Sequence, residues 1–493
     1  MSLSRKKSLD SLMAQAADSE KGLKRTLGAW SLIALGIGAI IGAGLFVRTA
    51  AAAGEHAGAA VTVSFLVAAV GCAFAGLCYA EFASMIPIAG SAYTYAYTTM
   101  GELTAWIIGW ALVLEYALGA ATVSISWSEY LNKLMGGSIP FEWCHSPFER
   151  VLDTAGVMHH GIVNIPALII LLLLSLLLMK GTSESATVNS IIVVIKVAIV
   201  LVFIAVGWHF VNPGNHTPYV IPADAPPALL RDGTFYSYTG FFRHGWGGIL
   251  SGAGVVFFAF IGFDAVSTAA QEAKNPARDM PRGILGSLLI CTILYVLFSW
   301  VLTGVAPYTD FMKSGKEASV AYAIETYMHG YHWLSTLVTI AILLGFSSVI
   351  LVMLLGQSRV FYTMATDGLL PKVFCELHPK WRTPYKSNGI LFLFVGLFAG
   401  FVPESVAGNL TSIGTLFAFI LVSIGVIILR RTDPNRTRPF KTPLVPIIPA
   451  LGVIVCAAMI VGLETGTQLT ALAWMIIGLV IYFCYSRKHS KLQ

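Results

Sequence analysis

Three ionisable side chains, those of Glu115, Lys196 and Asp264, stand inside long apolar stretches of this 493-residue chain. Charges at membrane depth are costly, so they pair with one another or with backbone carbonyls and mark functional sites. Lys196 lies about 13 Å along a helix from its inner end. Its stem reaches only about 6 Å, too short for the ammonium to snorkel to the membrane surface. Because burial favours the uncharged amine, we expect Lys196 to gain and lose a proton near neutral pH.

The two carboxylates have more than one expected role. Either one suits a guanidinium or ammonium group of a ligand buried at membrane depth. Asp264 also suits the cap of an inner half-helix that starts after Gly262, and this role is compatible with ligand contact. Glu115 is expected to carry a proton beside Lys196, to meet a cationic ligand, or to tie its helix to a neighbour.

Helix-breaking residues interrupt two apolar stretches of the chain, residues 36–46, which contain Gly42 and Gly44, and residues 257–264, which contain Gly262. In hydrocarbon a broken helix survives only where its freed N–H and C=O groups find a partner inside the protein. The alternative for a Gly-x-Gly pattern is close helix packing. The pairing of two breaks, one near the start of each half, favours the binding site of a transporter.

The two breaks are predicted to have opposite polarity. The outer half of the first broken helix begins near Ala43, and its free N–H groups suit a carboxylate. Gly42 and Gly44 lack a Cβ, which lets a ligand approach the backbone closely. In the second break the carbonyls of Phe258, Ala259 and Ile261 end a half-helix and suit an ammonium. Together the two breaks predict a site for a zwitterion.

The composition places these residues in an integral membrane protein. Hydrophobic residues make up 56% of the chain, charged residues 11%, and the mean hydropathy is +0.76, far from the values of soluble domains. About twelve apolar runs are long enough to span the bilayer as helices. The predicted spans are 30–53, 58–82, 103–131, 163–180, 187–209, 247–270, 283–307, 333–358, 388–403, 407–430, 444–462 and 468–486.

Lysine and arginine gather in every second loop, which sets the expected orientation. The predicted inner segments hold Lys274, Arg278 and Arg282; Lys372, Lys380, Arg382 and Lys386; Arg430, Arg431, Arg436, Arg438 and Lys441; and both termini. We therefore expect a multi-pass protein of the plasma (inner) membrane with both termini in the cytoplasm and no cleaved signal sequence. The net charge of +6 then reflects topology and an anionic lipid bilayer, and no nucleic-acid partner is expected.

The spacing of the breaks predicts an inverted repeat. Residues 30–209 form a first block of five helices and residues 247–430 a second block in the opposite orientation. The flanking segments are a cytoplasmic N-terminal segment (1–29), an outer loop (210–246), two appended helices (444–486) and a cytoplasmic tail (487–493). The expected fold class is an all-α membrane protein with a five-plus-five inverted repeat, in which helices 1 and 6 are broken.

Other classes of function find little support in the sequence. Most cysteines lie within apolar spans, so no disulfide framework is expected, and no histidine lies deep enough to ligate a haem cofactor. A metal transporter would need side-chain donors at the breaks, and Gly42, Ala43 and Gly44 offer none. We expect no cofactor, no metal and no enzymatic activity. A non-transporting amino acid sensor is the alternative class, but the tails are too short for a signalling domain.

Several motifs carry a family resemblance. The runs 38–46 and 87–95, the run Phe260 to Val266 followed by 272–276, and the run 368–371 resemble the amino acid-polyamine-organocation (APC) superfamily. Within it they are most similar to the cationic amino acid transporter family and its bacterial members. The resemblance covers nearly the whole chain and implies alternating access through a five-plus-five core of the LeuT type.

The resemblance also implies roles for single residues. By similarity, the backbone clamp of the substrate comprises Ile40, Ala43, Gly44, Phe258, Ala259 and Ile261. Many relatives carry Ser or Thr where this chain has Ala43, which leaves only amides for the carboxylate. A lysine at the place of Lys196 stands where sodium-coupled relatives hold their ion, which implies proton coupling without sodium.

The expected function is proton-coupled secondary transport of L-amino acids across the plasma membrane. The expected cargo is cationic (arginine, lysine or ornithine), with Glu115 and Asp264 near its side chain, or small and neutral, with Met353 limiting the length of the pocket. Amino acid exchange by the same fold is the alternative. The expected partners are the substrate, protons and lipid, and a small single-span accessory helix is left open.

Overall fold

The computed structural model describes residues 5–7, 27–86, 91–152, 156–180, 186–268, 270, 273–314 and 319–491. Most of the predicted segment 1–29, the motif residues 87–90 and Glu272 lie outside these ranges. The described chain is mostly helical, with two short antiparallel strand pairs, β1 (Arg150–Leu152) with β2 (Met158–His160) and β3 (Ala228–Leu229) with β4 (Phe235–Tyr236). This confirms the predicted helical class.

Among the described residues, seven helical stretches are long and apolar enough to cross a membrane, and five shorter apolar helices accompany them. The long stretches are Gly44–Met85, Glu102–Leu134, Ile191–Phe210, Pro276–Val305, His332–Thr366, Glu404–Thr432 and Thr465–His489. The shorter helices are Ala29–Ile40, Ile165–Lys180, Gly245–Phe260, Tyr385–Phe401 and Ile447–Gly462. Each predicted apolar range overlaps one of these stretches, as expected for a multi-pass membrane protein.

The helices have the following bounds in chain order. They are α2 (Ala29–Ile40), α3 (Thr49–Ala52), α4 (Val61–Met85), α5 (Ser91–Thr99), α6 (Glu102–Val113), α7 (Gly119–Leu134), α8 (Ile165–Lys180), α9 (Ala186–Gly207), α10 (Gly245–Val256), α11 (Ala265–Thr268), α12 (Pro276–Val305), α13 (Asp310–Ser314), α14 (Ser319–Tyr327), α15 (His332–Thr366), α16 (Tyr385–Phe401), α17 (Glu404–Thr432), α18 (Ile447–Gly462), α19 (Thr465–Ile481) and α20 (Arg487–His489). The wide turns η2 (Gly44–Arg48), η3 (Ala53–Ala57), η5 (Leu114–Leu118) and η13 (Tyr482–Ser486) are π-helical, and η10 (Phe257–Phe260) is a 3₁₀-helix.

Two helices run further than the apolar pattern predicts. Helix α12 begins at Pro276, not at 283, because a proline is well suited to the first turn of a helix. Helix α15 continues to Thr366, beyond 358. In both cases the apolar stretch gives the part of the helix that lipid would cover, and polar residues extend it.

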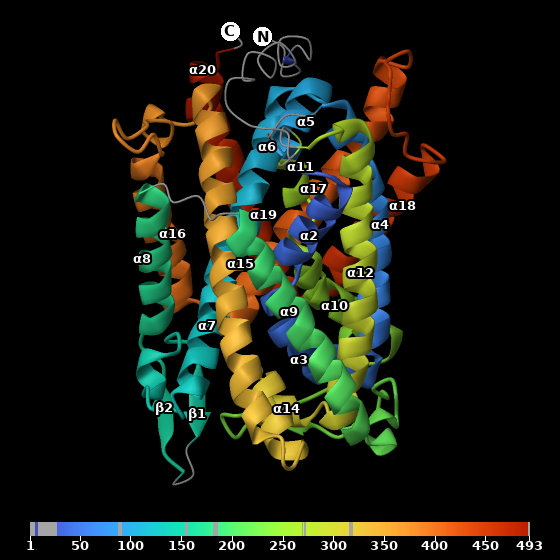
Figure 1. The fold of residues 1–493 in the computed structure, drawn as a ribbon, viewed down its shortest axis with the longest axis vertical. Coiled ribbons are helices and arrows are strands. Elements are labelled where there is room, and N and C mark those ends of the chain that lie inside the picture. The colour runs from blue at the N-terminus through green and yellow to red at the C-terminus, as the bar shows by residue number, and fades with distance from the viewer. Residues whose placement is uncertain are drawn as a thin grey trace.

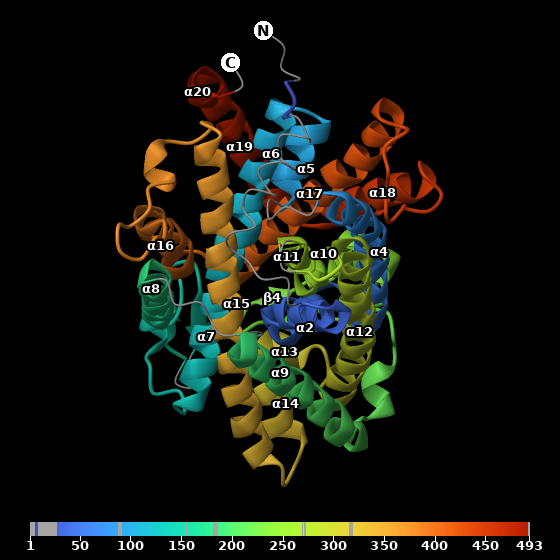
Figure 2. The same cartoon turned by 45° about the horizontal axis from the view of Figure 1, so that its top comes forward.

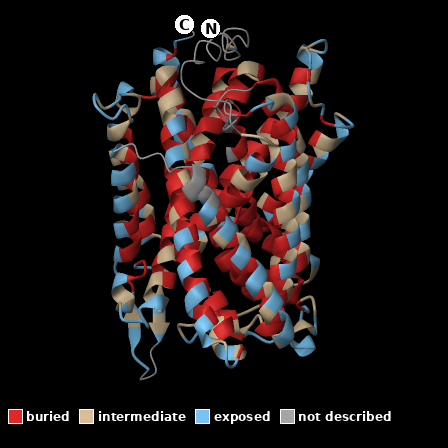
Figure 3. Cartoon of the chain, viewed as in Figure 1, coloured by how far each residue is buried: buried red, intermediate tan, exposed pale blue. Residues whose placement is uncertain are grey.

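The short and interrupted helices lie in the middle of the molecule. Helices α2, α10 and α11 are surrounded by α4, α9, α12 and α15 in both views (Figures 1 and 2). Buried residues concentrate in this centre, while exposed residues face outward along the surrounding helices (Figure 3). Many of the exposed residues are large and apolar, including Leu173, Leu397 and Leu469. Such an outer surface suits contact with lipid.

The described ends of the chain meet at one end of the molecule. Asp367, directly after α15, lies 2.5 Å from the Lys7 ammonium and accepts a hydrogen bond of 2.9 Å from the Tyr93 hydroxyl. Its backbone carbonyl accepts a bond from the Lys491 amide. Residues 5–7 and the described part of the C-terminal tail are therefore on the same side of the helices.

The opposite end carries the strand pair β1–β2 (Figure 1). There the imidazole of His145 lies 2.5 Å from the Glu129 carboxylate, at the end of α7. Burial alone would lower the pKa of His145, but the Glu129 carboxylate raises it to about 8. Glu149 acts in the same direction as Glu129, and Arg231 opposes them. This ion pair fastens the loop after α7 to the helix.

Candidate functional site

The first break lies where the sequence predicts it. Helix α2 ends at Ile40, Ile41 has an extended backbone (φ −72°, ψ 109°), and the helix resumes at Ala43 and Gly44. The first N–H groups of a helix have no carbonyl one turn earlier to bond to. The amides at Ala43 and Gly44 are thus in the position for which the carboxylate contact was predicted.

The second break follows η10. Ile261 is non-helical, and Gly262 has φ +110°, a conformation that only glycine adopts readily. A Cβ at Gly262 would lie 2.8 Å from the carbonyl oxygen of Ala39, at the end of α2. Gly262 therefore both makes the turn and lets the second break pack against the first.

Gly44 has a different role from the predicted one. A Cβ at Gly44 would lie 2.1 Å from the Cα of Ala259. The sequence interpretation gave this space to a ligand, but the Ala259 backbone fills it, so the missing side chain lets the two breaks touch. At Gly42 the nearest atom to a Cβ would be in Val349 of α15, at 3.2 Å.

One tyrosine that the sequence analysis did not single out connects the two breaks. The hydroxyl of Tyr295, on α12, lies 3.0 Å from the Ile40 carbonyl and 2.8 Å from the Ala259 carbonyl. It has a single proton, so it donates to these two carbonyls in alternation or shares the proton between them. Of the predicted clamp carbonyls, that of Ala259 therefore already has a protein donor, and that of Phe258 accepts a hydrogen bond of 3.3 Å from the Ile261 amide.

Lys196 is buried on α9, with 2% of its surface exposed. Its ammonium donates a hydrogen bond of 2.8 Å to the carbonyl of Gly38, in the last turn of α2. A cation is favoured there because the carbonyl end of a helix carries partial negative charge. Gly345 of α15 makes room for the lysine stem, since a Cβ there would lie 2.9 Å from Lys196 Cε.

Glu115, on η5, and Asp264, in the second break, are both fully buried and close to each other. The Tyr116 hydroxyl donates a hydrogen bond of 2.9 Å to Asp264. Two carboxyl groups close together in a buried site cannot both be ionised at low cost. The structure brings these two predicted residues together, whereas the contact of Lys196 is at Gly38.

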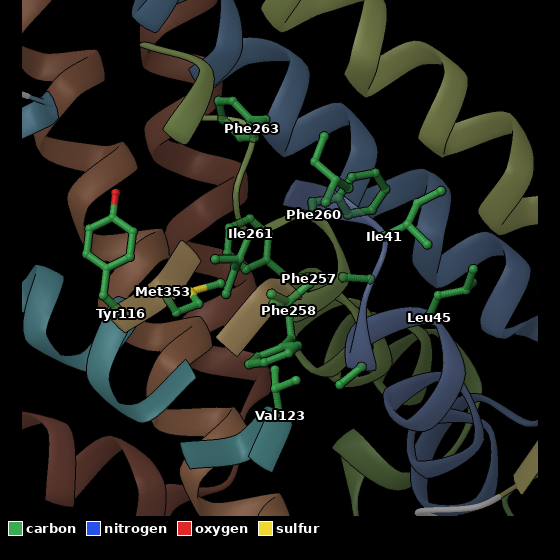
Figure 4. Close-up of a cluster of buried hydrophobic side chains, with 14 of the residues drawn as sticks. Ile41, Leu45, Tyr116, Val123, Phe257, Phe258, Phe260, Ile261, Phe263 and Met353 are labelled. Carbon is green, nitrogen blue, oxygen red and sulfur yellow. The ribbon is translucent and has the colours of Figure 1, made fainter. Parts of the chain in front are cut away.

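Apolar side chains cluster beside the breaks (Figure 4). Met353 of α15 lies beside Ile261, and the ring of Phe258 points toward Val123 of α7 (Figure 4). Met353 is 4% exposed, and its sulfur would lie 3.3 Å from a Cβ at Gly119.

A second buried cation, Arg48, was missed by the sequence analysis. It lies on η2 with 1% of its surface exposed and is 3.2 Å from the Glu404 carboxylate at the start of α17. It also donates a hydrogen bond to the Asn409 side chain. The rule that singled out Lys196, a charge inside an apolar stretch, would have found Arg48 too.

A cavity of about 270 Å³ lies away from the breaks, between the end of α4, α5 and the end of α17. Its lining includes Ile86, Thr99 and Arg436, together with Lys6 of the N-terminal segment. The predicted site residues are not part of this lining. The cavity thus belongs to the end of the molecule where Lys7 and Asp367 meet.

Two broken helices that touch at their breaks, inside a bundle with an apolar surface, define a membrane transport protein. Residues 27–482 match the amino acid permease family, and the chain belongs to this family. This confirms the resemblance to the APC superfamily.

The relatives found cover most or all of the chain. The branched-chain amino acid permease BcaP of Bacillus subtilis (strain 168) is 44% identical over 493 residues, 100% of this chain and 99% of that protein. The methylthioribose transporter of the same organism is 38% identical, again with 100% and 99% coverage. The vacuolar cationic amino acid transporter 4 of Arabidopsis thaliana is 36% identical over 88% of this chain and 68% of its own length. Amino acid transport is the function that these relatives support.

Proposed function

We propose that this protein is a proton-coupled, sodium-independent permease of the plasma membrane that carries neutral L-amino acids with apolar, branched side chains. The observation that supports this most is the contact between two breaks of opposite backbone polarity. The amides at Ala43 and Gly44 suit the substrate carboxylate, and the carbonyls of Phe258 and Ile261 suit its ammonium. Ile40 and Ala259 complete the clamp.

The side-chain preference rests on the surroundings of the breaks. Met353, Ile261, Phe258 and Val123 are apolar and face the same region (Figure 4). An apolar substrate side chain gains about 25 cal/mol for each Å² buried against such a surface. The relative that carries the name of a branched-chain permease, at 44% identity, agrees with this choice.

Cationic amino acids are the second candidate, because Glu115 and Asp264 lie nearby and carry negative charge when ionised. Two features favour the neutral substrate. The Tyr116 hydroxyl already donates to Asp264, and a proton on the carboxyl pair would remove most of its attraction for a cation. The 36% identity to a plant protein named for cationic amino acids keeps arginine in the test.

Proton coupling is assigned to Lys196, with the Glu115 carboxyl as the second proton site. The protonated amine stabilises the end of α2 through Gly38. Loss of the proton weakens this contact and releases the inner half of the first broken helix. In alternating access, the five-plus-five core would rock around the breaks, with twelve membrane-spanning segments and both termini in the cytoplasm.

The test is uptake of labelled L-leucine, L-arginine and L-alanine into proteoliposomes, with an inward proton gradient and no sodium. Methylthioribose is added as a competitor because of the relative with that name. We expect gradient-driven leucine uptake that Lys196→Ala abolishes while leucine exchange persists. Lys313→Ala, at a lysine that is more than half exposed, is the matched control and leaves uptake unchanged.

The outcomes separate the parts of the proposal. Arginine uptake that exceeds leucine uptake contradicts the substrate assignment and leaves the coupling intact. Uptake that requires sodium, or full activity of Lys196→Ala, contradicts the coupling mechanism. Exchange without net uptake in the wild type identifies an exchanger, and binding without either identifies a sensor.

The pocket length is tested separately with Met353→Ala. Removing the flexible side chain next to Gly119 and Ile261 opens room for longer side chains. We expect the ratio of arginine to leucine uptake to rise about tenfold, the scale of one or two methylene groups in an apolar pocket. An unchanged ratio contradicts a role of Met353 in substrate length.

A further inference from the structure

Gln357 of α15 is a buried amide that the proposed mechanism does not use. None of its surface is exposed. Within the described part of the chain, neither its Nε2 nor its Oε1 has a protein hydrogen-bond partner. Buried polar groups without a partner are rare and call for an explanation such as an ordered water or a ligand.

The place of Gln357 on α15 follows from its neighbours. Met353, one turn earlier, contacts the position of Gly119, and Gly356 lies against the Tyr116 ring, which a Cβ would approach to 3.2 Å. Residues three and four apart share a helix face. Gln357 is therefore on the face of α15 toward η5, one turn beyond Met353 in the direction of Asp367.

Glu115 lies on η5 next to Tyr116, in the same layer. Neither of its carboxyl oxygens has a well-formed hydrogen bond within the described residues. The nearby Thr415 hydroxyl donates its proton to the Thr411 carbonyl instead, at 3.1 Å. Glu115 and Gln357 are thus two buried polar groups with unused hydrogen-bonding capacity on facing segments.

We propose that Gln357 is a positioning residue for the proton on Glu115, holding the carboxyl through one bound water. The inference rests on the proposed proton coupling and deepens it. A glutamine suits this task because its amide has both donors and an acceptor. Through the water it donates toward an ionised Glu115 and accepts from a protonated one, so the contact persists in both states of the cycle.

Other titratable groups also lie around Glu115. Asp264 lies close to Glu115 and accepts from Tyr116. Tyr79 of α4 is also near both carboxyls, and Tyr95 of α5 faces Asp264. These hydroxyls have a proton to donate to an ionised carboxyl. Lys196, the cation that the proposed mechanism uses, is bonded to Gly38.

The test measures leucine uptake by proteoliposomes from pH 5 to pH 9, with kcat and KM determined separately, for the wild type, Gln357→Leu and Gln357→Asn. Loss of the amide disfavours the ionised carboxyl more than the neutral one, because hydrogen bonds to charged groups are stronger. For Gln357→Leu we therefore expect the pH at which kcat falls to half its maximum to rise by about one unit. KM for leucine stays within about twofold, because Gln357 does not touch the substrate. Gln357→Asn keeps an amide and shifts the midpoint by less than half as much.

Two further comparisons decide the interpretation. In a Glu115→Gln background, Gln357→Leu is expected to cause no additional pH shift, since the two residues act through one proton. An unchanged midpoint in Gln357→Leu, or an additive shift in the Glu115→Gln background, overturns the inference. A rise in KM at constant pH midpoint also overturns it and places Gln357 in contact with substrate. If Gln357→Leu does not fold, the Gln357→Asn profile and a Gln357→Met variant carry the same test.

The failure of this inference is distinguishable from that of the proposed function. A wild type whose uptake ignores the proton gradient removes proton coupling itself. A wild type driven by the gradient, with a Gln357→Leu profile identical to it, removes only the assignment of Gln357.

Discussion

Two buried cations of this protein are held in different ways. Arg48, on the outer half of the first broken helix, faces a carboxylate and a side-chain amide of α17. Lys196, on α9, donates to a backbone carbonyl at the end of α2. A guanidinium stays charged at any physiological pH, whereas the proposed coupling requires Lys196 to release its proton.

The Arg48 contact is a permanent ion pair, whereas deprotonation of Lys196 would release the Lys196 contact. The Arg48 contact joins two oppositely charged groups, and loss of either leaves the other charged in a buried place. The Lys196 contact joins a charge to a neutral dipole, and a neutral amine leaves no buried charge behind. The two halves of one broken helix thus have contacts of opposite character, and under the proposed mechanism the half that carries Arg48 stays attached to α17 while the half that contains Gly38 moves.

The largest expected effect is that of Arg48→Ala on stability. Removing the guanidinium breaks a buried ion pair, which costs about 3–5 kcal/mol. The apparent melting temperature of the purified protein in detergent measures it. The double variant Arg48→Met with Glu404→Leu removes both charges and is expected to recover most of the loss. An Arg48→Ala protein as stable as the wild type would show that the Arg48–Glu404 ion pair does not stabilise the fold.

The next effect is that of Lys196→Arg on activity. Arginine keeps the charge but cannot be deprotonated in a protein, so the tie to Gly38 becomes permanent. We expect gradient-driven uptake to fall about a hundredfold, the lower range of a lost proton-transfer group, with the fold preserved. The matched control is Arg48→Lys, which keeps a charge near Glu404 and is expected to retain proton-driven uptake. Normal uptake by Lys196→Arg would mean that transport does not require Lys196 to lose its proton.

The positions of the breaks could be predicted from the sequence, but their contacts could not. A helix interrupted by glycine inside an apolar stretch is a local pattern, and Gly42 and Gly262 lie at the two breaks. The use of Gly44 depends on Ala259, more than two hundred residues away. One sequence without an alignment holds no information on such a pairing.

The same limit applies to Tyr295 and Gly345. Tyrosine and glycine are common in apolar helices, and only the packing of α12 and α15 against α2 and α9 shows that they contact Ile40 and Lys196. Lys196, Glu115 and Asp264 could be found because a charge in an apolar stretch has few explanations. The hydrogen-bond partners of these charges, which decide between a tie and a proton site, required the structure.

His145 is a third cation and lies outside the membrane-spanning segments. Its ion pair with Glu129 exists only at a pH at which the imidazole is protonated. Its pKa in the folded protein is about 8, above the usual value of about 6.5. The stabilisation by Glu129 is therefore fully present below about pH 6.5 and is lost as the pH rises through about 8. We expect a loss of about 2 kcal/mol from pH 6.5 to pH 9, seen as a lower melting temperature.

The control for this pH effect is His145→Gln. This variant cannot take up a proton, so the part of the pH dependence that belongs to the His145–Glu129 pair should disappear. An equal pH dependence in the wild type and in His145→Gln would assign the effect to other groups. The His145–Glu129 pair would then not stabilise the protein at any pH.

The smallest expected effect is that of Tyr295→Phe, which removes a neutral contact shared by both breaks. A hydrogen bond between uncharged groups contributes about 1 kcal/mol, so stability should fall by that amount.

Tyr238→Phe is the matched control, because its hydroxyl also donates to one carbonyl, that of Gly54, at 2.7 Å and away from the breaks. Both variants should lose similar stability, but only Tyr295→Phe should change leucine uptake, by about fivefold. The reason is that Tyr295 competes with the substrate ammonium for the Ala259 carbonyl and holds the ends of two broken helices together. Equal uptake by both variants would contradict this role of Tyr295 in transport. The charged contacts of Arg48 and Lys196 would then be the ones that distinguish the two halves of the helix.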